Sequence, residues 1–142
     1  MSATLLIPAS PLRSVSGPAL HLEEPISFWG GVSPEDGRLL EPRNAAHGES
    51  VSGRVLLIRE LRGSSSASSV LLELIHRGAA PAAIILHEAD AILALGILVA
   101  QEMAWHTPPM IQMPADAQRR VPKDVVISVA PDGRIAWNTA AL

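Results

Sequence analysis

Two short runs of consecutive apolar residues stand out in the middle of the 142-residue chain. Residues 53–59 contain Val55-Leu56-Leu57-Ile58, and residues 82–86 read Ala-Ala-Ile-Ile-Leu. Runs of this length without polar alternation are typical of strands that are buried on both faces, as in parallel sheets. A third, shorter run at residues 110–113 predicts a third strand.

The two intervals between these strands have helical periodicity. From about Ser68 to Arg77 the apolar residues fall on one side of a helix, and Gly78 is well placed to end it. Asp90 can cap a second helix that runs toward Trp105. A strand–helix–strand–helix–strand order predicts parallel pairing with right-handed crossovers.

The two ends of the chain have weaker patterns. Residues 1–18 are rich in Ser, Pro and Ala without a sustained period, which predicts a flexible or irregular arm and leaves residues 19–142 as a single domain. Turn residues at 33–38 predict a link between two short strands, and residues 125–137 predict a terminal hairpin. The expected fold class is α/β, with a partly parallel central sheet, flanking helices and β-hairpins at the ends.

The composition excludes several classes of function. A net charge of −3 gives no electrostatic reason to expect nucleic-acid binding. The chain has no cysteine, which excludes disulfides, thiolate zinc sites and iron–sulfur ligands on this chain. The longest apolar stretch, residues 91–100, is half the length of a membrane span, and residues 1–8 make a poor signal peptide. We therefore expect a soluble, cytoplasmic protein with no membrane partner.

A serine-rich loop at residues 62–69 joins the first buried strand to the first predicted helix. It contains Arg62, Gly63 and five serines. Backbone N–H groups and the positive end of the dipole at a helix N-terminus suit an anion, or a serine oxygen that loses its proton. The simpler interpretation is a polar loop with a serine helix cap. The loop matches neither a Gly-x-Ser-x-Gly elbow nor a phosphate-binding P-loop, and its own pattern leaves both interpretations open.

Other candidate residues carry weaker signals. The five histidines have no metal-ligating spacing, so we predict no metal site on this chain. His87 remains a second candidate because it directly follows a predicted strand, where sites in α/β folds tend to lie. Trp29 stands beside Gly30-Gly31, either as a core residue or as an interface anchor, and the sequence does not separate these alternatives.

Several segments between residues 25 and 113 carry a family resemblance. They are residues 25–32 (PISFWGGV), Glu49, residues 53–56 (GRVL), residues 62–66 (RGSSS), residues 78–84 (GAAPAAI) and residues 92–96 (ILALG). Together and in this order they resemble the aconitase X swivel domain family, in its bacterial form. The two ends of the chain lie outside this resemblance.

The resemblance implies a swivelling β/β/α domain that closes over a larger domain holding a metal or iron–sulfur centre. In such hydro-lyases the swivel loop supplies a serine alkoxide that takes a proton from a substrate carbon, while the metal acts as a Lewis acid on the departing hydroxyl. By this resemblance Ser64, the first serine after the glycine, is the catalytic base, and Ser65 is the alternative. The substrate is then expected to contact the rest of the loop: Arg62, Gly63, Ser65 and Ser66.

One position departs from the family pattern. Leu61 stands where the family usually has glycine, and leucine restricts the backbone where glycine does not. This departure keeps open a second function, a non-catalytic module that binds an anion or serves assembly.

The lack of cysteine gains a meaning under the resemblance. We expect this chain to bind no cofactor, and a separate large catalytic subunit to hold iron or an iron–sulfur cluster. The chain would then be the small subunit of a dehydratase that is active only as a hetero-oligomer. The expected substrate is a small hydroxy acid, cis-3-hydroxy-L-proline, with phosphomevalonate as the alternative.

Overall fold

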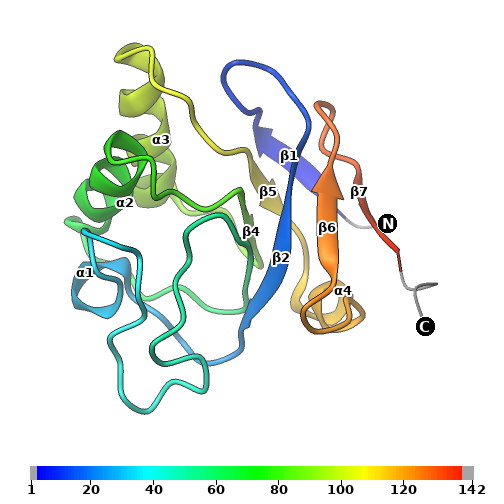
Figure 1. The fold of residues 1–142 in the computed structure, drawn as a ribbon, viewed down its shortest axis with the longest axis horizontal. Helices are drawn as coiled ribbons and strands as arrows, with labels where there is room; N and C mark the ends of the chain where they lie inside the picture. The colour runs from blue at the N-terminus through cyan, green and yellow to red at the C-terminus, as the bar shows by residue number, and fades with distance from the viewer. Residues whose placement is uncertain (1–2, 139–142) are drawn as a thin grey trace.

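The centre of the fold is a seven-stranded sheet with the order β1-β5-β4-β3-β2-β6-β7 (Figure 1). The computed structural model describes residues 3–138. Strands β2 to β5 are mutually parallel where they pair, and β1, β6 and β7 are antiparallel to their neighbours. The strands are β1 Thr4–Ile7, β2 Val15–Leu22, β3 Val55–Ile58, β4 Ala83–Leu86, β5 Met110–Gln112, β6 Val126–Val129 and β7 Ile135–Trp137.

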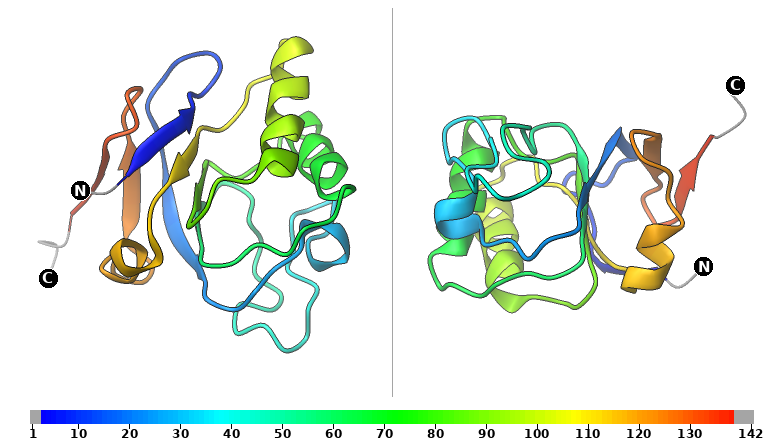
Figure 2. Two further views of the ribbon diagram at one scale, coloured as in Figure 1. Left: turned by 180° about the vertical axis from the view of Figure 1, so that it is seen from behind. Right: turned by 90° about the horizontal axis from the view of Figure 1, so that it is seen from below.

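Helices α1, α2 and α3 lie on one face of the parallel strands, and the sheet curls so that α4 and the β6–β7 hairpin lie on the other side of these strands (Figure 2). Their bounds are α1 Phe28–Gly31, α2 Ala67–His76, α3 Ala91–Glu102 and α4 Ala115–Arg119. The predicted cap of α3 is confirmed, because the Asp90 carboxylate accepts a hydrogen bond from the Leu93 N–H at 2.9 Å. The short helix α4 has no counterpart among the elements predicted from the sequence.

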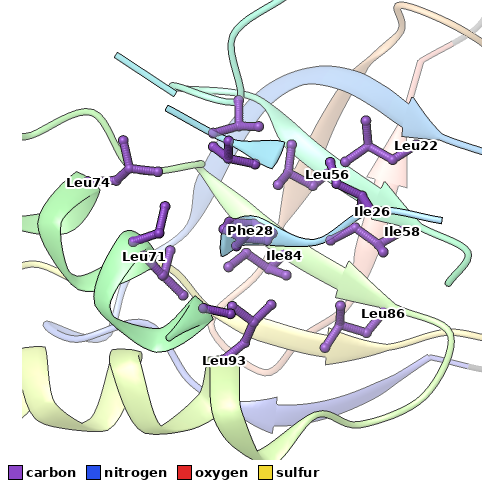
Figure 3. Packing of buried hydrophobic residues seen from close by; sticks show 14 of the residues in the cluster. Leu22, Ile26, Phe28, Leu56, Ile58, Leu71, Leu74, Ile84, Leu86 and Leu93 are labelled. Carbon is purple, nitrogen blue, oxygen red and sulfur yellow. The ribbon is translucent and has the colours of Figure 1, made fainter. Parts of the chain in front are cut away.

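The core consists of two apolar clusters, one on each side of the sheet. Every residue of β3 and β4 is buried, as the sequence predicts for strands with two covered faces. Along β3, Leu56 packs toward α2 and α3 (Figure 3), while Leu57 packs toward α4 and the β6–β7 hairpin. This alternation follows from the two-residue period of a strand.

Helix α3 lies unusually close to the first turn of α2. A Cβ atom on Gly96 would stand 2.8 Å from the carbonyl oxygen of Ser68, so only glycine permits this approach. The contact holds the start of α2, and with it the C-terminal part of the serine loop, against a second helix.

The N-terminal segment differs from the irregular arm that we expect for residues 1–18. That expectation is wrong for Thr4–Ile7, which forms β1 against β5, and for the start of Val15–Leu22, because β2 runs through the boundary expected at residue 18. These short segments are ordered as strands because they pair with distant segments of the chain. A local sequence period does not reveal such pairing. Residues 1–2 and 139–142 of the predicted arm and domain lie outside the described residues.

The N-terminal and C-terminal ends of the chain differ in how their strands pair. The C-terminal hairpin is confirmed as β6 and β7. Near the N-terminus, β1 and β2 pair with other strands, and the turn at residues 33–38 is accompanied by isolated antiparallel bridges, Val32 with Leu39 and Arg38 with Ser50.

Candidate functional site

The first half of the serine loop is fastened to the segment that begins at Ile26. Leu61 forms a parallel bridge with Ile26, and the Arg62 N–H donates to the Ile26 carbonyl at 2.8 Å. The Ile26 N–H in turn donates to the carbonyl of Glu60 at 3.1 Å. These bonds bring together two segments of the resemblance, residues 25–32 and 62–66, that are far apart in the sequence.

Leu61 does not strain this loop. The non-glycine residues with positive φ in the described chain are Ala104 and Asp124, so Leu61 avoids the left-handed region where leucine is unfavourable. Its half-buried side chain instead packs against the core cluster under α2 and α3. Leucine at this position therefore anchors the loop, and its presence is no argument against an active site.

Ser64 lies half-buried at the approach to α2. Its Oγ accepts a long hydrogen bond, 3.3 Å, from the Ser66 N–H, and its carbonyl accepts one from the Ala67 N–H at 3.0 Å. The hydroxyl oxygen thus faces a backbone donor beside the positive end of a ten-residue helix, where a negative charge on oxygen is favoured. Ser66 occupies the cap position, but its side chain makes no capping hydrogen bond.

The other serines of the loop differ in whether their hydroxyl groups form hydrogen bonds with the backbone. Ser69 donates to the Ser66 carbonyl at 2.7 Å, and Ser68 donates to the Ser65 carbonyl at 3.3 Å, so both hydroxyls stabilise the first turn. Ser65 is exposed, as is Gly63, where an added Cβ would meet no atom within 4 Å. Among residues 3–138 no basic or acidic side chain hydrogen-bonds the Ser64 hydroxyl, so no general base is paired with this serine in the described part of the chain.

A hollow of about 640 Å³ opens beside the loop on the Arg62 side. It is lined by residues 24–27, residues 29–31, Glu41, Arg43, Asn44 and Arg62. Trp29 forms part of its wall with 58% of its surface exposed, whereas its neighbour Phe28 is fully buried. The backbone leaves the helical conformation at Trp29, where ψ is 115°, and Gly30 has a φ of 80°, so the chain turns sharply just after Phe28. Trp29 is therefore a surface residue, and Phe28 fills the core.

A smaller hollow, about 330 Å³, lies at the carboxyl ends of β3 and β4 and is lined by His87. The His87 Nδ1 accepts a hydrogen bond from the Ala115 N–H at 2.9 Å, and the His87 carbonyl accepts one from the Gln112 side chain at 2.8 Å. These bonds fix the ring and leave Nε2 as the protonated nitrogen of the neutral imidazole. His87 is thus held in place near the loop, but it does not contact Ser64.

Arg59, which directly follows β3, points to the opposite face of the sheet. Its guanidinium donates to the Gln118 Oε1 at 2.9 Å and to the His21 Nδ1 at 2.9 Å, and lies 3.7 Å from the Glu23 carboxylate. Burial lowers the pKa of the Arg59 guanidinium, and Glu23 acts in the opposite direction. Burial and the neighbouring Arg59 charge likewise lower the pKa of His21. These partners hold the Arg59 guanidinium within the cluster, although Arg59 also lines the smaller hollow.

The described chain offers no ligand set for a metal centre. No group of three or more His, Cys, Asp or Glu side chains within residues 3–138 is arranged to hold a metal ion, and the sequence contains no cysteine. The donors of an iron–sulfur cluster or of mononuclear iron are therefore not assembled in this part of the chain. No helix between residues 3 and 138 is long and apolar enough to span a membrane.

The model of the aconitase X swivel domain matches residues 10–137 of this chain. The chain belongs to the aconitase X swivel domain family. The fold agrees: the crystal structure of Thermococcus kodakaraensis aconitase X in its holo-form is similar, with a TM-score of 0.76 and 25% identity over 94% of this chain and 97% of that chain. The resemblance seen in the sequence and the expected fold class are both confirmed.

Two relatives of this swivel domain differ in overall length. A cis-3-hydroxy-L-proline dehydratase of Pseudomonas aeruginosa is 44% identical over 109 residues, which are 76% of this chain and 19% of that protein. A phosphomevalonate dehydratase small subunit of Methanopyrus kandleri is 33% identical over 137 residues, 89% of this chain and 96% of the relative. The chain thus spans about a fifth of the first relative and nearly all of the second.

Sequence reasoning missed the loop at residues 41–45, which supplies Glu41, Arg43 and Asn44 to the larger hollow. The loop has no hydrophobic period and matches no motif, so nothing in its local pattern marks Arg43. Only the fold brings it into the same hollow as Arg62 and residues 24–31.

Proposed function

We propose that this chain is the swivel part of an aconitase X type dehydratase and that Ser64 is its catalytic base. The observation that carries the proposal is the placement of the Ser64 oxygen at the start of α2, toward the Ser66 N–H and with no base of its own. Family membership and the two relatives named as dehydratases support the reaction type.

In the proposed reaction the Ser64 alkoxide takes a proton from a substrate carbon. The electron pair of the broken C–H bond forms a C=C bond as the hydroxyl leaves the neighbouring carbon as hydroxide. The proton that Ser64 has taken up then passes to this hydroxide, so the alkoxide is restored and the products are an alkene and water. The Ser66 N–H and the positive end of α2 stabilise the alkoxide. Arg62, Gly63, Ser65 and Ser66 complete the proposed contacts with the substrate.

The other half of the site is assigned to a partner. Residues 3–138 supply no metal ligand set, so we assign the departure of the hydroxyl to a large catalytic subunit that holds iron or an iron–sulfur cluster. The incomplete surroundings of Ser64 support this division, as does the small-subunit name of the Methanopyrus relative. The proposed enzyme is a cytoplasmic hetero-oligomer, active only when the swivel part closes on the large part.

The proposed substrate is cis-3-hydroxy-L-proline. The 44% identity with the Pseudomonas dehydratase of that substrate favours it. Phosphomevalonate is the second candidate, favoured by the relative that this chain matches over nearly its full length.

The test compares serine variants in the enzyme assembled with its large partner. Replacing the base removes the proton acceptor, so S64A should lower kcat for dehydration of cis-3-hydroxy-L-proline by about 10²- to 10⁴-fold. S69A is the matched control, because the Ser69 hydroxyl is bonded to the Ser66 carbonyl.

A full rate for S64A together with a large loss for S65A would move the base to Ser65. A full rate in both variants would show that neither Ser64 nor Ser65 is the catalytic base. If the assembled protein dehydrates neither cis-3-hydroxy-L-proline nor phosphomevalonate, the alternative function becomes the better description of this chain. In that case the chain is a non-catalytic module that binds an anion or serves assembly.

A further inference from the structure

The larger hollow contains charges of both signs that the chain leaves unpaired. Arg43 and Arg62 are exposed in its lining, and within residues 3–138 neither takes part in an ion pair. Glu41 also lines the hollow without a salt bridge in the described residues, and Trp29 supplies an aromatic wall. The hollow therefore presents two cations, two carboxylates and an aromatic face on the Arg62 side of the serine loop; one oxygen of Glu24 accepts a backbone N–H, and Glu41 has no salt bridge in the described residues.

The backbone that carries these charges is fixed. The Glu24 carboxylate accepts the Ala45 N–H at 3.0 Å, which ties the loop at residues 41–45 to the segment after β2. Asn44 is buried, and its side chain accepts the Ala46 N–H at 2.8 Å. On the other side of the hollow, Arg62 is held through its own N–H to Ile26. The unpaired charges thus stand on anchored segments, which reduces the entropy lost when a ligand binds.

The net charge of the lining distinguishes between ligands. Glu24, Glu41, Arg43 and Arg62 sum to zero, and one oxygen of Glu24 is already engaged. A phosphate ester with a second carboxylate carries only negative charge, so it would place that charge near Glu41 with no cation of its own to offset it. A zwitterionic amino acid carries a carboxylate for the arginines and an ammonium for Glu41 and the face of Trp29.

We propose that Arg43 is a specificity-determining residue that, together with Arg62, binds the carboxylate of a cyclic hydroxy amino acid, while Glu41 binds its ring ammonium. The inference rests on the proposed function, since it places the non-reacting groups of the substrate beside Ser64. It assigns substrate choice to the hollow and proton removal to the loop.

The experiment measures binding and turnover separately in the enzyme assembled with its large partner. L-proline has the carboxylate and ammonium of the proposed substrate but lacks the hydroxyl that leaves. Pyrrolidine lacks the carboxylate, and tetrahydrofuran-2-carboxylate has an ether oxygen in place of the ammonium. Titration calorimetry gives the Kd of each probe, and steady-state kinetics gives kcat and KM for cis-3-hydroxy-L-proline.

For R43Q we expect the Kd of L-proline to rise about 10- to 100-fold, with pyrrolidine binding unchanged, because only the carboxylate contact is lost. KM should rise while kcat stays within a few-fold, since the lost contact is equal in the ground state and the transition state. R43K keeps the charge and should recover part of the affinity. E41Q should weaken L-proline and pyrrolidine but leave tetrahydrofuran-2-carboxylate unaffected.

R38Q is the matched control, because Arg38 is an exposed arginine outside the hollow that pairs with Asp36 at 3.2 Å. If R43Q behaves like R38Q while S64A still abolishes dehydration, the inference fails and the proposed function stands. If L-proline binding depends on Arg43 but cis-3-hydroxy-L-proline is not dehydrated, the proposed function fails and the inference stands. An unchanged ratio of L-proline to tetrahydrofuran-2-carboxylate affinity in E41Q overturns the role of Glu41.

Discussion

Arg59 and Arg62 stand three residues apart after β3, yet their guanidinium groups lie in opposite surroundings. Arg59 is buried and is bonded to Gln118 and His21 on the α4 side of the sheet. Arg62 is exposed in the hollow beside the serine loop, with no ion pair in the described part of the chain.

The difference separates structural charge from charge that is available to a ligand. Removing Arg59 from water is tolerated because acceptors inside the fold replace its hydration. Gln118 is equally committed, since its Nε2 donates to the carbonyls of Ile58 and Met113 while its oxygen accepts from Arg59. Within residues 3–138 the Arg62 side chain has no such partners, so its hydrogen-bonding capacity remains available to a ligand.

The strongest test of this comparison concerns stability. Replacing Arg59 by methionine keeps much of the volume but leaves the Gln118 oxygen and the His21 Nδ1 without their donor, so R59M should lower the free energy of unfolding by about 2–4 kcal/mol. R62M should change it by less than about 0.5 kcal/mol. Urea unfolding of both variants measures the difference. Equal losses in the two variants would contradict the division between structural and available charge.

The second test concerns activity and should show the reverse order. R62M removes the proposed charged contact with the substrate, so kcat/KM of the assembled enzyme should fall about 10- to 100-fold at unchanged stability. R119M is a suitable control, because Arg119 is an exposed arginine that pairs with Asp116 on α4, away from the loop. Unaltered kinetics in R62M would show that the exposed arginine is not used by the substrate.

The smallest expected effect is a pH dependence within the buried cluster. The pKa of His21 is lowered from 6.5 by burial and by Arg59, so the folded state favours the neutral ring. The contribution of His21 is therefore fully present above pH 6.5 and is lost as the pH falls toward the depressed value in the folded state. The free energy of unfolding should decrease over that interval.

H21Q keeps an acceptor for Arg59 but does not titrate, so its stability should depend less on pH than that of the wild type. Urea unfolding of both proteins between about pH 7.5 and pH 5 checks this. The exposed carboxyls of Asp36 and Asp132 have pKa values lowered from 3.8, by the backbone N–H groups of Arg38 and Arg134, and titrate below this interval. Parallel pH profiles for H21Q and the wild type would contradict the assignment.

The sequence predicts the middle of the fold better than its edges. The buried runs of β3 and β4, the two helices between the parallel strands and the Asp90 cap follow from composition over short windows. The strands β1 and β2 were not predictable in this way, because their partners lie on β5, β3 and β6. The five-residue helix α4, which carries Gln118, is too short to show a helical period.

For the candidate site, the sequence indicates the serine loop but not its surroundings. The alternation along β3 does indicate the direction of the Arg59 side chain. Arg59 follows Leu57 by two residues, so its side chain lies on the same side of the sheet, toward α4. Trp29 is exposed while its neighbour Phe28 is buried, and the pattern of aromatic residues does not encode that choice.

The sequence by itself determined the strand–helix–strand core, the serine loop at the start of a helix, and the family, because contiguous burial and motif order are local properties of the chain. Only the tertiary structure decided which arginine is buried and which is free, that Trp29 is exposed, and that Arg43 stands in the same hollow as Arg62. The physical reason is that the environment of a charge depends on the acceptors that distant segments bring to it. Two arginines that are three residues apart in the sequence can therefore lie in different environments.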